Sequence, residues 1–213
     1  MGTRGAVGFY HDGENKIMYN HFDSYPSELG VDILNFLRAT AIDELNKMFD
    51  NIKMIRCGEK PTPEQIEHCK QMGVVDLDVG EQSEEDWYCL LRRAQGNLKV
   101  YKDGLIYMED NHLFICDSLF CEWAYVINLD ENLLEVYVGF NHSSEPQEGN
   151  RYWEEFVNKR EETDLESYYP CTLFCTFPFD NLPDEKEFLN KIKQADKLLH
   201  SYRYVEEEGG SAV

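Results

Sequence analysis

Two segments with the pattern of β-hairpins, far apart in the chain, most constrain what this sequence can fold into. Residues 5–11 and 15–20 form two runs on either side of an Asp-Gly turn at residues 12–13, a turn sequence typical of a hairpin. Residues 119–129 and 133–140 are dense in β-branched and aromatic side chains and are joined by a short polar loop. Because hairpins pair antiparallel strands, the sequence predicts an antiparallel sheet.

Helical periodicity fills much of the chain between and after these hairpins. Apolar residues recur at helical spacing over residues 29–52, which predicts one long helix or two in series. Thr62 and Gln65 predict a capping box that begins a second helix, and Ser83 and Asp86 predict another that opens a short helix. The other expected elements are a helix at residues 152–157, a strand at 171–177 and an amphipathic helix at 184–202.

The order of these elements predicts the α+β class, with an antiparallel sheet built from hairpins and covered by flanking helices. The N-terminal-nucleophile hydrolases are a layered sandwich of this general kind. At 213 residues, the length suits one domain, which we assign to residues 1–205, followed by a disordered tail at residues 206–213.

The formal charge of −21 is unevenly distributed along the chain. Residues 1–75 hold 11 acids and 8 bases, whereas residues 76–213 hold 30 acids and 12 bases. Such a field repels the phosphates of nucleic acids and anionic membranes, and it steers basic partners toward the protein. Direct nucleic-acid binding is therefore not expected. The excess acid is either a solvated surface or a decoy for a basic groove on another protein.

The seven cysteines and six histidines show no short metal-ligand spacing. The sequence therefore predicts no metal site and no cofactor, and it predicts free thiols in a reducing compartment. No apolar run is long enough to span a bilayer and no signal peptide begins the chain, so we expect a cytoplasmic protein without a membrane partner. Cys171 and Cys175, four apart in an expected strand, should share one face.

A nucleophile is conceivable at the start of the chain. Cutting the Gly2-Thr3 bond would expose an N-terminal threonine, whose own amine serves as the base for its hydroxyl. Thr3 is therefore a candidate catalytic residue. The alternative is an ordinary strand that starts at Gly2.

The segment Tyr19–Pro26 is unusually rich in hydrogen-bonding side chains for a connection between a strand and a helix. His21 is a candidate general base, oriented by Asp23. The alternative is that Asn20, Asp23 and Ser24 satisfy the turn and cap the following helix. The candidate substrate-binding residues of this loop are Tyr19, Asn20 and Tyr25.

The N-terminal strand carries a lone cation and two glycines. Arg4 would fix the fold if it were buried against Asp23 or Glu122, and it would hold a carboxylate or phosphate if it lay at the mouth of a pocket. Gly5 and Gly8 indicate either the close approach of another group to this strand or a bulge.

Carboxylates precede indole rings at Asp86-Trp87 and at Glu122-Trp123. An apolar neighbour raises the pKa of a carboxyl group, which suits it to acid-base work. Glu122 is therefore a candidate catalytic residue, and Trp87 and Trp123 are candidate substrate-binding residues, together with Arg4.

Four strings in the sequence resemble the shared motifs of an uncharacterised family of hypothetical proteins from phages, bacteria and fungi. They are MGTRG at residues 1–5, YNHFDSYP at 19–26, EDWYCLL at 85–91 and LFCEWAY at 119–125. The resemblance implies kinship over most of residues 1–140 but no activity, because none is established for that family. It also implies that the shared motifs include Arg4, His21, Asp23, Trp87, Glu122 and Trp123.

Two hypotheses of function follow from the residues. The first is a metal-independent hydrolase, in which Thr3 or a water activated by His21 is the nucleophile and Arg4 holds an anionic group of a small ligand. The second is a non-enzymatic, acidic binding protein, such as a phage-type inhibitor that covers a basic surface of a host protein. The sequence does not indicate an oligomeric state.

Overall fold

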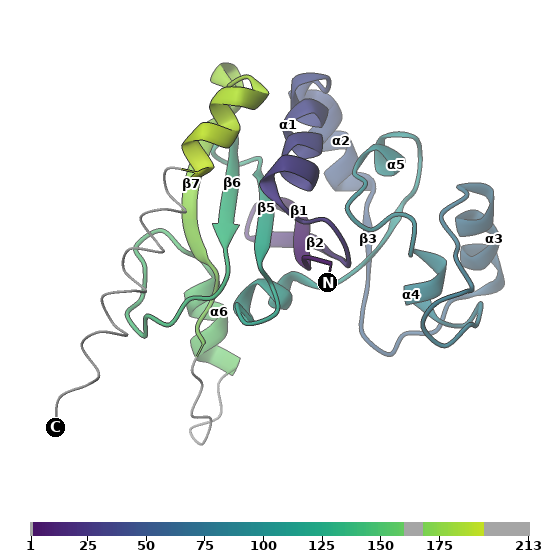
Figure 1. Ribbon diagram of the computed structural model, residues 1–213. Helices are drawn as coiled ribbons and strands as arrows, with labels where there is room; N and C mark the ends of the chain where they lie inside the picture. The colour runs from purple at the N-terminus through teal and green to yellow at the C-terminus, as the bar shows by residue number, and fades with distance from the viewer. Residues whose placement is uncertain (1, 160–167, 194–213) are drawn as a thin grey trace, which may run out of the picture.

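The first strand is hydrogen-bonded on both sides and organises the main sheet. In the computed structural model, which describes residues 2–159 and 168–193, strand β1 (Gly5–His11) pairs antiparallel with β2 (Glu14–Asn20). On its other side β1 pairs parallel with β5 (Trp123–Asn128). Two segments more than a hundred residues apart in sequence therefore lie side by side (Figure 1).

The sheet has five strands in the order β2-β1-β5-β6-β7. Strand β6 (Leu133–Val138) pairs antiparallel with β5 and with β7 (Thr172–Pro178). Both expected hairpins, β1-β2 and β5-β6, are present, and the α+β class with a mostly antiparallel sheet is confirmed. The parallel pair β1-β5 and the antiparallel pair β6-β7 are the two junctions of this sheet that the hairpin patterns did not predict.

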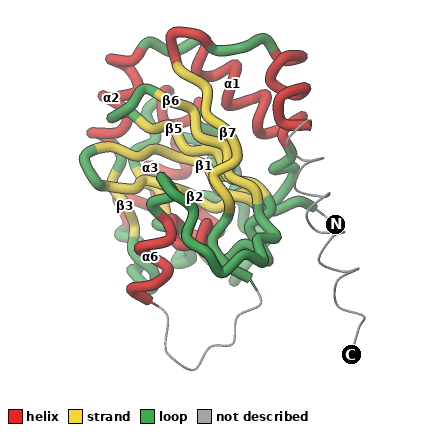
Figure 2. Tube along the Cα trace, turned by 90° about the vertical axis from the view of Figure 1, so that its left-hand side faces the viewer, coloured by secondary structure: helices red, strands yellow, loops and turns green. Residues whose placement is uncertain are grey.

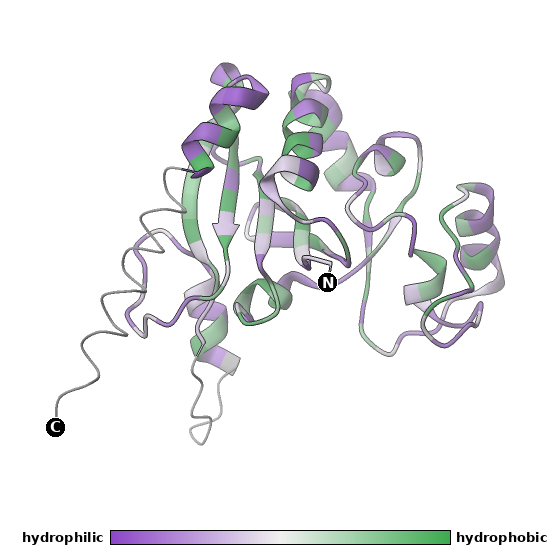
Figure 3. Cartoon of the chain, viewed as in Figure 1, coloured by the Kyte–Doolittle hydropathy of each residue, from purple (hydrophilic) through white to green (hydrophobic). Residues whose placement is uncertain are grey.

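One face of the sheet carries the larger apolar core. Helices α1 (Val31–Arg38) and α2 (Ile42–Asn51) and the helical residues 185–193 pack here against Phe9, Tyr125 and other side chains of the strands. In Figure 2 the strands lie between α1 and α2 at one side and α6 at the other. Figure 3 shows hydrophobic and hydrophilic residues mixed along α1, as an amphipathic covering helix requires.

The opposite face of the sheet carries a smaller core. The 3₁₀ helix η2 (His112–Cys116) and helix α6 (Tyr152–Lys159) cover it, and Tyr152 packs there against Tyr137 with ring centroids 5.2 Å apart. His112, in η2, forms an ion pair with Glu155 of α6 and another with Asp110, and these contacts raise the pKa of its imidazole to about 9.

The remaining elements lie beside the β2 edge of the sheet (Figure 1). They are the two parallel strands β3 (Lys53–Ile55) and β4 (Tyr107–Glu109) and the helices α3 (Pro63–Gln71), α4 (Trp87–Leu90) and α5 (Lys99–Lys102). After β4, Asn111 covers the free edge of β2 by donating its backbone N–H to the Ile17 carbonyl and accepting the Tyr19 N–H. An exposed strand edge is thereby protected.

A buried lysine ties β2 to the end of α2. The Nζ of Lys16 donates to the carbonyl oxygens of Phe49 at 2.8 Å and Ile52 at 2.9 Å. These are carbonyls at the C-terminal end of the helix, where the backbone dipoles favour a positive charge. The Lys16 ammonium thereby anchors the end of the helix to the sheet through two hydrogen bonds.

The expected helices agree with the structure except at their ends. The segment 29–52 forms two helices in series, preceded by a π-helical turn at Pro26–Gly30. The Thr62 capping box is confirmed, since Thr62 and Gln65 exchange hydrogen bonds. The Ser83 capping box is wrong: Asp86 itself caps α4, a helix of four residues.

The expectation that Cys171 and Cys175 share a face is also wrong. Strand β7 has an irregular register, in which Leu173 pairs with Tyr137 and Cys175 with Val136, so that Phe174 is an extra residue. One inserted residue reverses the alternation of side chains. Cys171 consequently lies in the smaller core and Cys175 packs against the larger one. All seven cysteines lie in the described part of the chain and are free thiols.

Two of the predicted features concern the C-terminal end of the chain. The expected tail at residues 206–213 and the end of the 184–202 helix lie outside the described residues. Among the residues that the structure does describe, no helix combines the length and the apolar character that crossing a bilayer requires.

A glycine substitution tests the close packing of β1. A Cβ at Gly8 would lie 2.0 Å from the Lys16 carbonyl oxygen, a backbone atom, so the strand must shift to accept it. We expect Gly8→Ala to lower the free energy of unfolding by about 3 kcal/mol or more. Gly13→Ala, at a turn position with φ of 78° and open space around it, should cost only roughly 1 kcal/mol. Equal losses in urea unfolding of the two variants would contradict this account.

Candidate functional site

The loop after β2 folds back on itself beside the start of β1. The Ser24 N–H donates to the Thr3 carbonyl at 3.1 Å, and the Asn20 side chain donates to the Phe22 carbonyl and, at 2.9 Å, to the Ser24 hydroxyl. Asp23 has a φ of 52°, which turns the chain. The alternative that these side chains satisfy the turn and cap the following helix is therefore correct for the turn, through Asn20, and wrong for the cap, because neither the π-helical turn nor α1 has a side-chain cap.

Five side chains from separate parts of the chain meet at this end of the sheet, and we call them the arginine cluster: Arg4, Tyr19, His21, Tyr88 and Arg92. The Nδ1 atom of His21 lies 2.8 Å from the Tyr19 hydroxyl and 3.4 Å from the Tyr88 hydroxyl. Arg4 acts electrostatically on the Tyr19 hydroxyl, and both arginines act electrostatically on His21. All five are partly exposed, so solvent reaches the cluster.

Both arginines of the cluster are held by aromatic rings rather than by carboxylates. The guanidinium of Arg4 lies 4.8 Å from the Phe120 ring centroid, and that of Arg92 lies 4.9 Å from the Phe22 ring centroid. Arg92 also donates to the Gln95 side chain. Within residues 2–159 and 168–193, neither arginine forms an ion pair, and the buried Nε of Arg92 has no hydrogen-bond partner.

The protonation states of the cluster follow from burial and charge. Burial, and then the charges of Arg92 and Arg4, lower the pKa of His21, which keeps its imidazole neutral at pH 7. Burial, and then Tyr88, raise the pKa of Tyr19. Tyr19 therefore keeps its proton and can donate it to Nδ1 of His21. That arrangement leaves the N–H of His21 on Nε2, as a further donor beside two cations.

A cleft of about 770 Å³ adjoins the cluster. It lies between the loop before α1, α1 itself and the segment that leads into α5. None of the five cluster residues lines the cleft, but Phe22 and Gln95, which both contact Arg92, do line it, so the two sites are neighbours. Its walls combine amides, carboxylates, the two lysines Lys99 and Lys102, and apolar side chains such as Ile33 and Phe36.

Thr3 lies away from the surface. Its side chain is 1% exposed, and its Oγ1 has no hydrogen-bond partner among the described residues. The neighbouring Gly5 is just as confined, because a Cβ there would lie 2.3 Å from the Trp123 carbonyl oxygen and 2.7 Å from Ser24. Thr3 is thus enclosed by the loop and by β5, and we do not include it in the site.

The other expected site residues are not gathered around His21. Trp87 and Trp123 are buried in the larger core. Glu122 lies before β5 and is partly buried, with its N–H donating to the Arg4 carbonyl at 3.0 Å. Tyr25 is 46% exposed at the start of the π-helical turn. The structure therefore brings together Arg4, Tyr19 and His21, but not with Asp23 or Glu122 as carboxylate partners.

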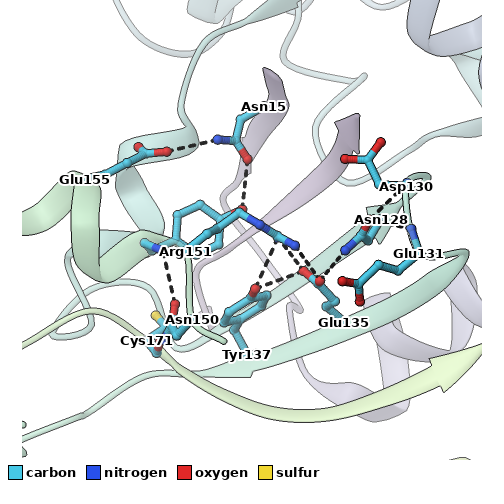
Figure 4. A network of polar contacts seen from close by, with 11 residues as sticks. Asn15, Asn128, Asp130, Glu131, Glu135, Tyr137, Asn150, Arg151, Glu155 and Cys171 are labelled. Atoms are coloured by element: carbon cyan, nitrogen blue, oxygen red, sulfur yellow. Dashed lines mark hydrogen bonds and ion pairs between the residues drawn. The ribbon is translucent and has the colours of Figure 1, made fainter. Parts of the chain in front are cut away.

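A second polar network lies at the other end of the smaller core and was not expected from the sequence. Figure 4 shows it around Arg151, which stands between β6 and α6. Both terminal nitrogens of Arg151 donate to the buried carboxylate of Glu135 at 2.6 Å, and its guanidinium covers the Tyr10 ring at 3.8 Å.

The acceptors of Glu135 are fully used inside the protein. Its Oε1 accepts from Asn128 and Arg151, and its Oε2 accepts from Tyr137 and Arg151. A carboxylate offers about four lone-pair directions, so none is left for a ligand. We therefore assign this network to the fold and not to a functional site.

An exposed trio of possible metal ligands forms where two hairpin turns meet. One ligand atom from each of His11, Asp12 and Asp130 lies within 4.8 Å of the others. The Asp130 carboxylate already accepts from the Asp12 backbone N–H at 3.0 Å and contacts His11 at 2.7 Å. These contacts explain why the three side chains lie together: they join the β1-β2 turn to the β5-β6 turn.

Comparison of the chain with models of protein families, with curated proteins and with solved structures finds no match. The resemblance of the four motif strings therefore stays a prediction. The site residues that sequence reasoning missed are Phe22, Tyr88, Arg92 and Phe120. Three of them lie within those strings, whereas nothing in the pattern around Arg92 distinguished it from Arg93.

Removing one or both partners tests the structural role of the Glu135-Arg151 pair. Arg151→Met leaves the buried Glu135 charge unpaired, and we expect the free energy of unfolding to fall by about 3–5 kcal/mol. The double variant Glu135→Gln, Arg151→Met removes that charge and should recover most of the loss in urea unfolding. A double variant less stable than Arg151→Met would contradict this assignment.

Sulfate tests the charge state of His21, because sulfate keeps its charge across this pH range. An anion in the cluster favours protonated His21 and so raises the pKa of this imidazole, which is lowered in the free protein. Sulfate therefore binds more tightly as the pH falls through the range between the pKa of the free protein and that of the complex. We expect sulfate to raise the Tm more at pH 5.5 than at pH 7.5, at constant ionic strength. In His21→Gln, sulfate should raise the Tm by the same amount at pH 5.5 and at pH 7.5. A larger increment at pH 7.5 in the unchanged protein would show that His21 takes no part.

Proposed function

We propose that the protein binds a small anionic ligand, a phosphate ester or carboxylate, in the arginine cluster. The observation that carries the proposal is the convergence of Arg4 and Arg92 on His21 without an ion pair to either arginine in the described part of the chain. Guanidinium groups bind carboxylate and phosphate oxygens in a forked geometry.

The charge balance of the chain makes this arrangement informative. The sequence has 41 acidic residues and 20 basic ones, so a carboxylate partner for an arginine is easily found. Arg93, next to Arg92, lies 3.6 Å from Asp76, and Arg151 has Glu135. Both cations act electrostatically on the same imidazole, and an anion bound beside it would be attracted by both.

Binding is better supported than hydrolysis. A histidine that acts as general base usually has a carboxylate or similar group to orient it, with a free nitrogen aimed at the substrate. Here the Tyr19 and Tyr88 hydroxyls occupy Nδ1 of His21, and Asp23 is not its partner. The other nitrogen carries the proton, so His21 is suited to donate to an anion. Hydrolase activity stays a prediction.

Two adjacent arginines provide the test. Arg92→Met keeps an unbranched aliphatic side chain and removes the guanidinium that lies over Phe22, whereas Arg93→Met removes a charge that is 63% exposed and paired with Asp76. We expect inorganic phosphate to raise the Tm of the unchanged protein and of Arg93→Met. In Arg92→Met its affinity should fall by about 10-fold to 100-fold, the loss of a charge-assisted hydrogen bond.

The stability of the free protein serves as the control. Because Arg92 has no ion pair, the Tm of Arg92→Met without phosphate should fall only slightly, through the loss of its contacts with the Phe22 ring and the Gln95 side chain. Equal phosphate affinity in Arg92→Met and Arg93→Met, measured by titration calorimetry, would refute anion binding at the cluster.

A further inference from the structure

We propose that the anion is the phosphate of a nucleoside monophosphate, whose ribose and base occupy the cleft beside Phe22. This inference rests on the proposed function, because it needs the phosphate to bind at the arginine cluster. It adds the chemical identity of the rest of the ligand.

Phe22 joins the cluster to the cleft. Its ring is 51% exposed, lies 4.9 Å from the Arg92 guanidinium and meets the His21 ring edge-on at 4.3 Å. The same residue lines the cleft. An exposed phenylalanine beside cationic side chains is the combination that holds a base by stacking and a phosphate by charge. A ligand that reaches from the cluster into the cleft must therefore pass this ring.

The walls of the cleft suit an uncharged body with hydroxyl groups. Asp23 and Asp32 supply carboxylates there, and Asn20 and Asn97 supply amides. Carboxylates accept hydrogen bonds from ribose hydroxyls, and amides read the donors and acceptors of a base edge. The lining holds four carboxylates, those of Asp23, Glu28, Asp32 and Asp103, against the two lysines Lys99 and Lys102. This excess of negative charge disfavours a second anionic group, so a ligand with one phosphate fits better than a polyphosphate or a nucleic-acid strand.

The size and the apolar part of the cleft agree with this class of ligand. A volume of about 770 Å³ lies within the range of roughly 300–1,000 Å³ of small-molecule sites. Leu29, Ile33 and Phe36 give part of the lining an apolar character, which a planar base can cover and a bare sugar phosphate cannot. A nucleoside monophosphate uses the cationic, polar and apolar parts of the site together.

The experiment compares ligands that add one part at a time. Titration calorimetry would measure inorganic phosphate, ribose 5-phosphate, adenosine, and the four ribonucleoside monophosphates AMP, GMP, CMP and UMP. We expect at least one monophosphate to bind about tenfold or more tightly than ribose 5-phosphate, the contribution of one stacked base. Adenosine, without the phosphate, should bind much more weakly than AMP.

Two phenylalanine variants locate the base. Phe22→Leu keeps an apolar side chain without the aromatic ring, and it should remove most of the advantage of the nucleotide over ribose 5-phosphate. The ring also supports Arg92, so the measured quantity is the ratio of the two affinities, from which a common change in phosphate binding cancels. Phe120→Leu is the matched variant, since Phe120 is also exposed and carries Arg4 but does not line the cleft. It should leave the nucleotide advantage unchanged.

The outcomes separate the two proposals. If phosphate binds and no nucleotide exceeds ribose 5-phosphate, the nucleotide assignment is overturned and anion binding stands. If Phe120→Leu abolishes the advantage and Phe22→Leu does not, the base lies outside the cleft and the assignment is likewise overturned. If neither phosphate nor any nucleotide binds, the proposed function itself fails.

Discussion

The structure depends on a first strand that is held between two others with no room for side chains at two positions. A Cβ at Gly5 would meet the Trp123 carbonyl oxygen and one at Gly8 the Lys16 carbonyl oxygen, so both neighbouring strands come close to β1. The parallel contact with β5 joins segments that are far apart in the sequence, so forming it costs the entropy of closing a long loop. Packing of the intervening chain must offset that cost. The local pairing with β2, in which Gly5 lies opposite Asn20, brings Arg4, just before β1, to the loop that contains His21.

The Glu135-Arg151 network and the arginine cluster differ in whether their charged groups are fully paired within the protein. The Glu135 carboxylate is buried and receives four hydrogen bonds, two of them from Arg151, so it is complete without a ligand. Arg4 and Arg92 are partly exposed, rest on aromatic rings and have no carboxylate in the described chain. A buried charge without a partner is strongly destabilising. A partly exposed cation without an ion pair is still hydrated, so it can remain unpaired until a ligand binds.

Much of the fold could be predicted from local patterns, because hairpin turns, capping boxes and periodicity are local physics. The α+β class, both hairpins and the Thr62 cap were predicted in this way. Long-range register could not be predicted: the extra residue Phe174 in β7 depends on pairing with β6, and it sent Cys171 and Cys175 to opposite faces. The site was predicted in part, since Arg4 and His21 belong to recognisable strings. Arg92 was missed because its neighbour along the chain is chemically identical.

The aromatic rings explain how two like charges are kept together in the free protein. Phe22 and Phe120 each present a ring face to one guanidinium, and such contacts attract a cation without neutralising it. A carboxylate in the same place would hold the arginine more firmly, but an incoming anion would then have to displace it. By supporting the cations with rings and keeping His21 neutral, the protein preserves their positive field for a ligand. The acidic remainder of the chain repels large polyanions, so this field acts on small ones that can enter the cluster.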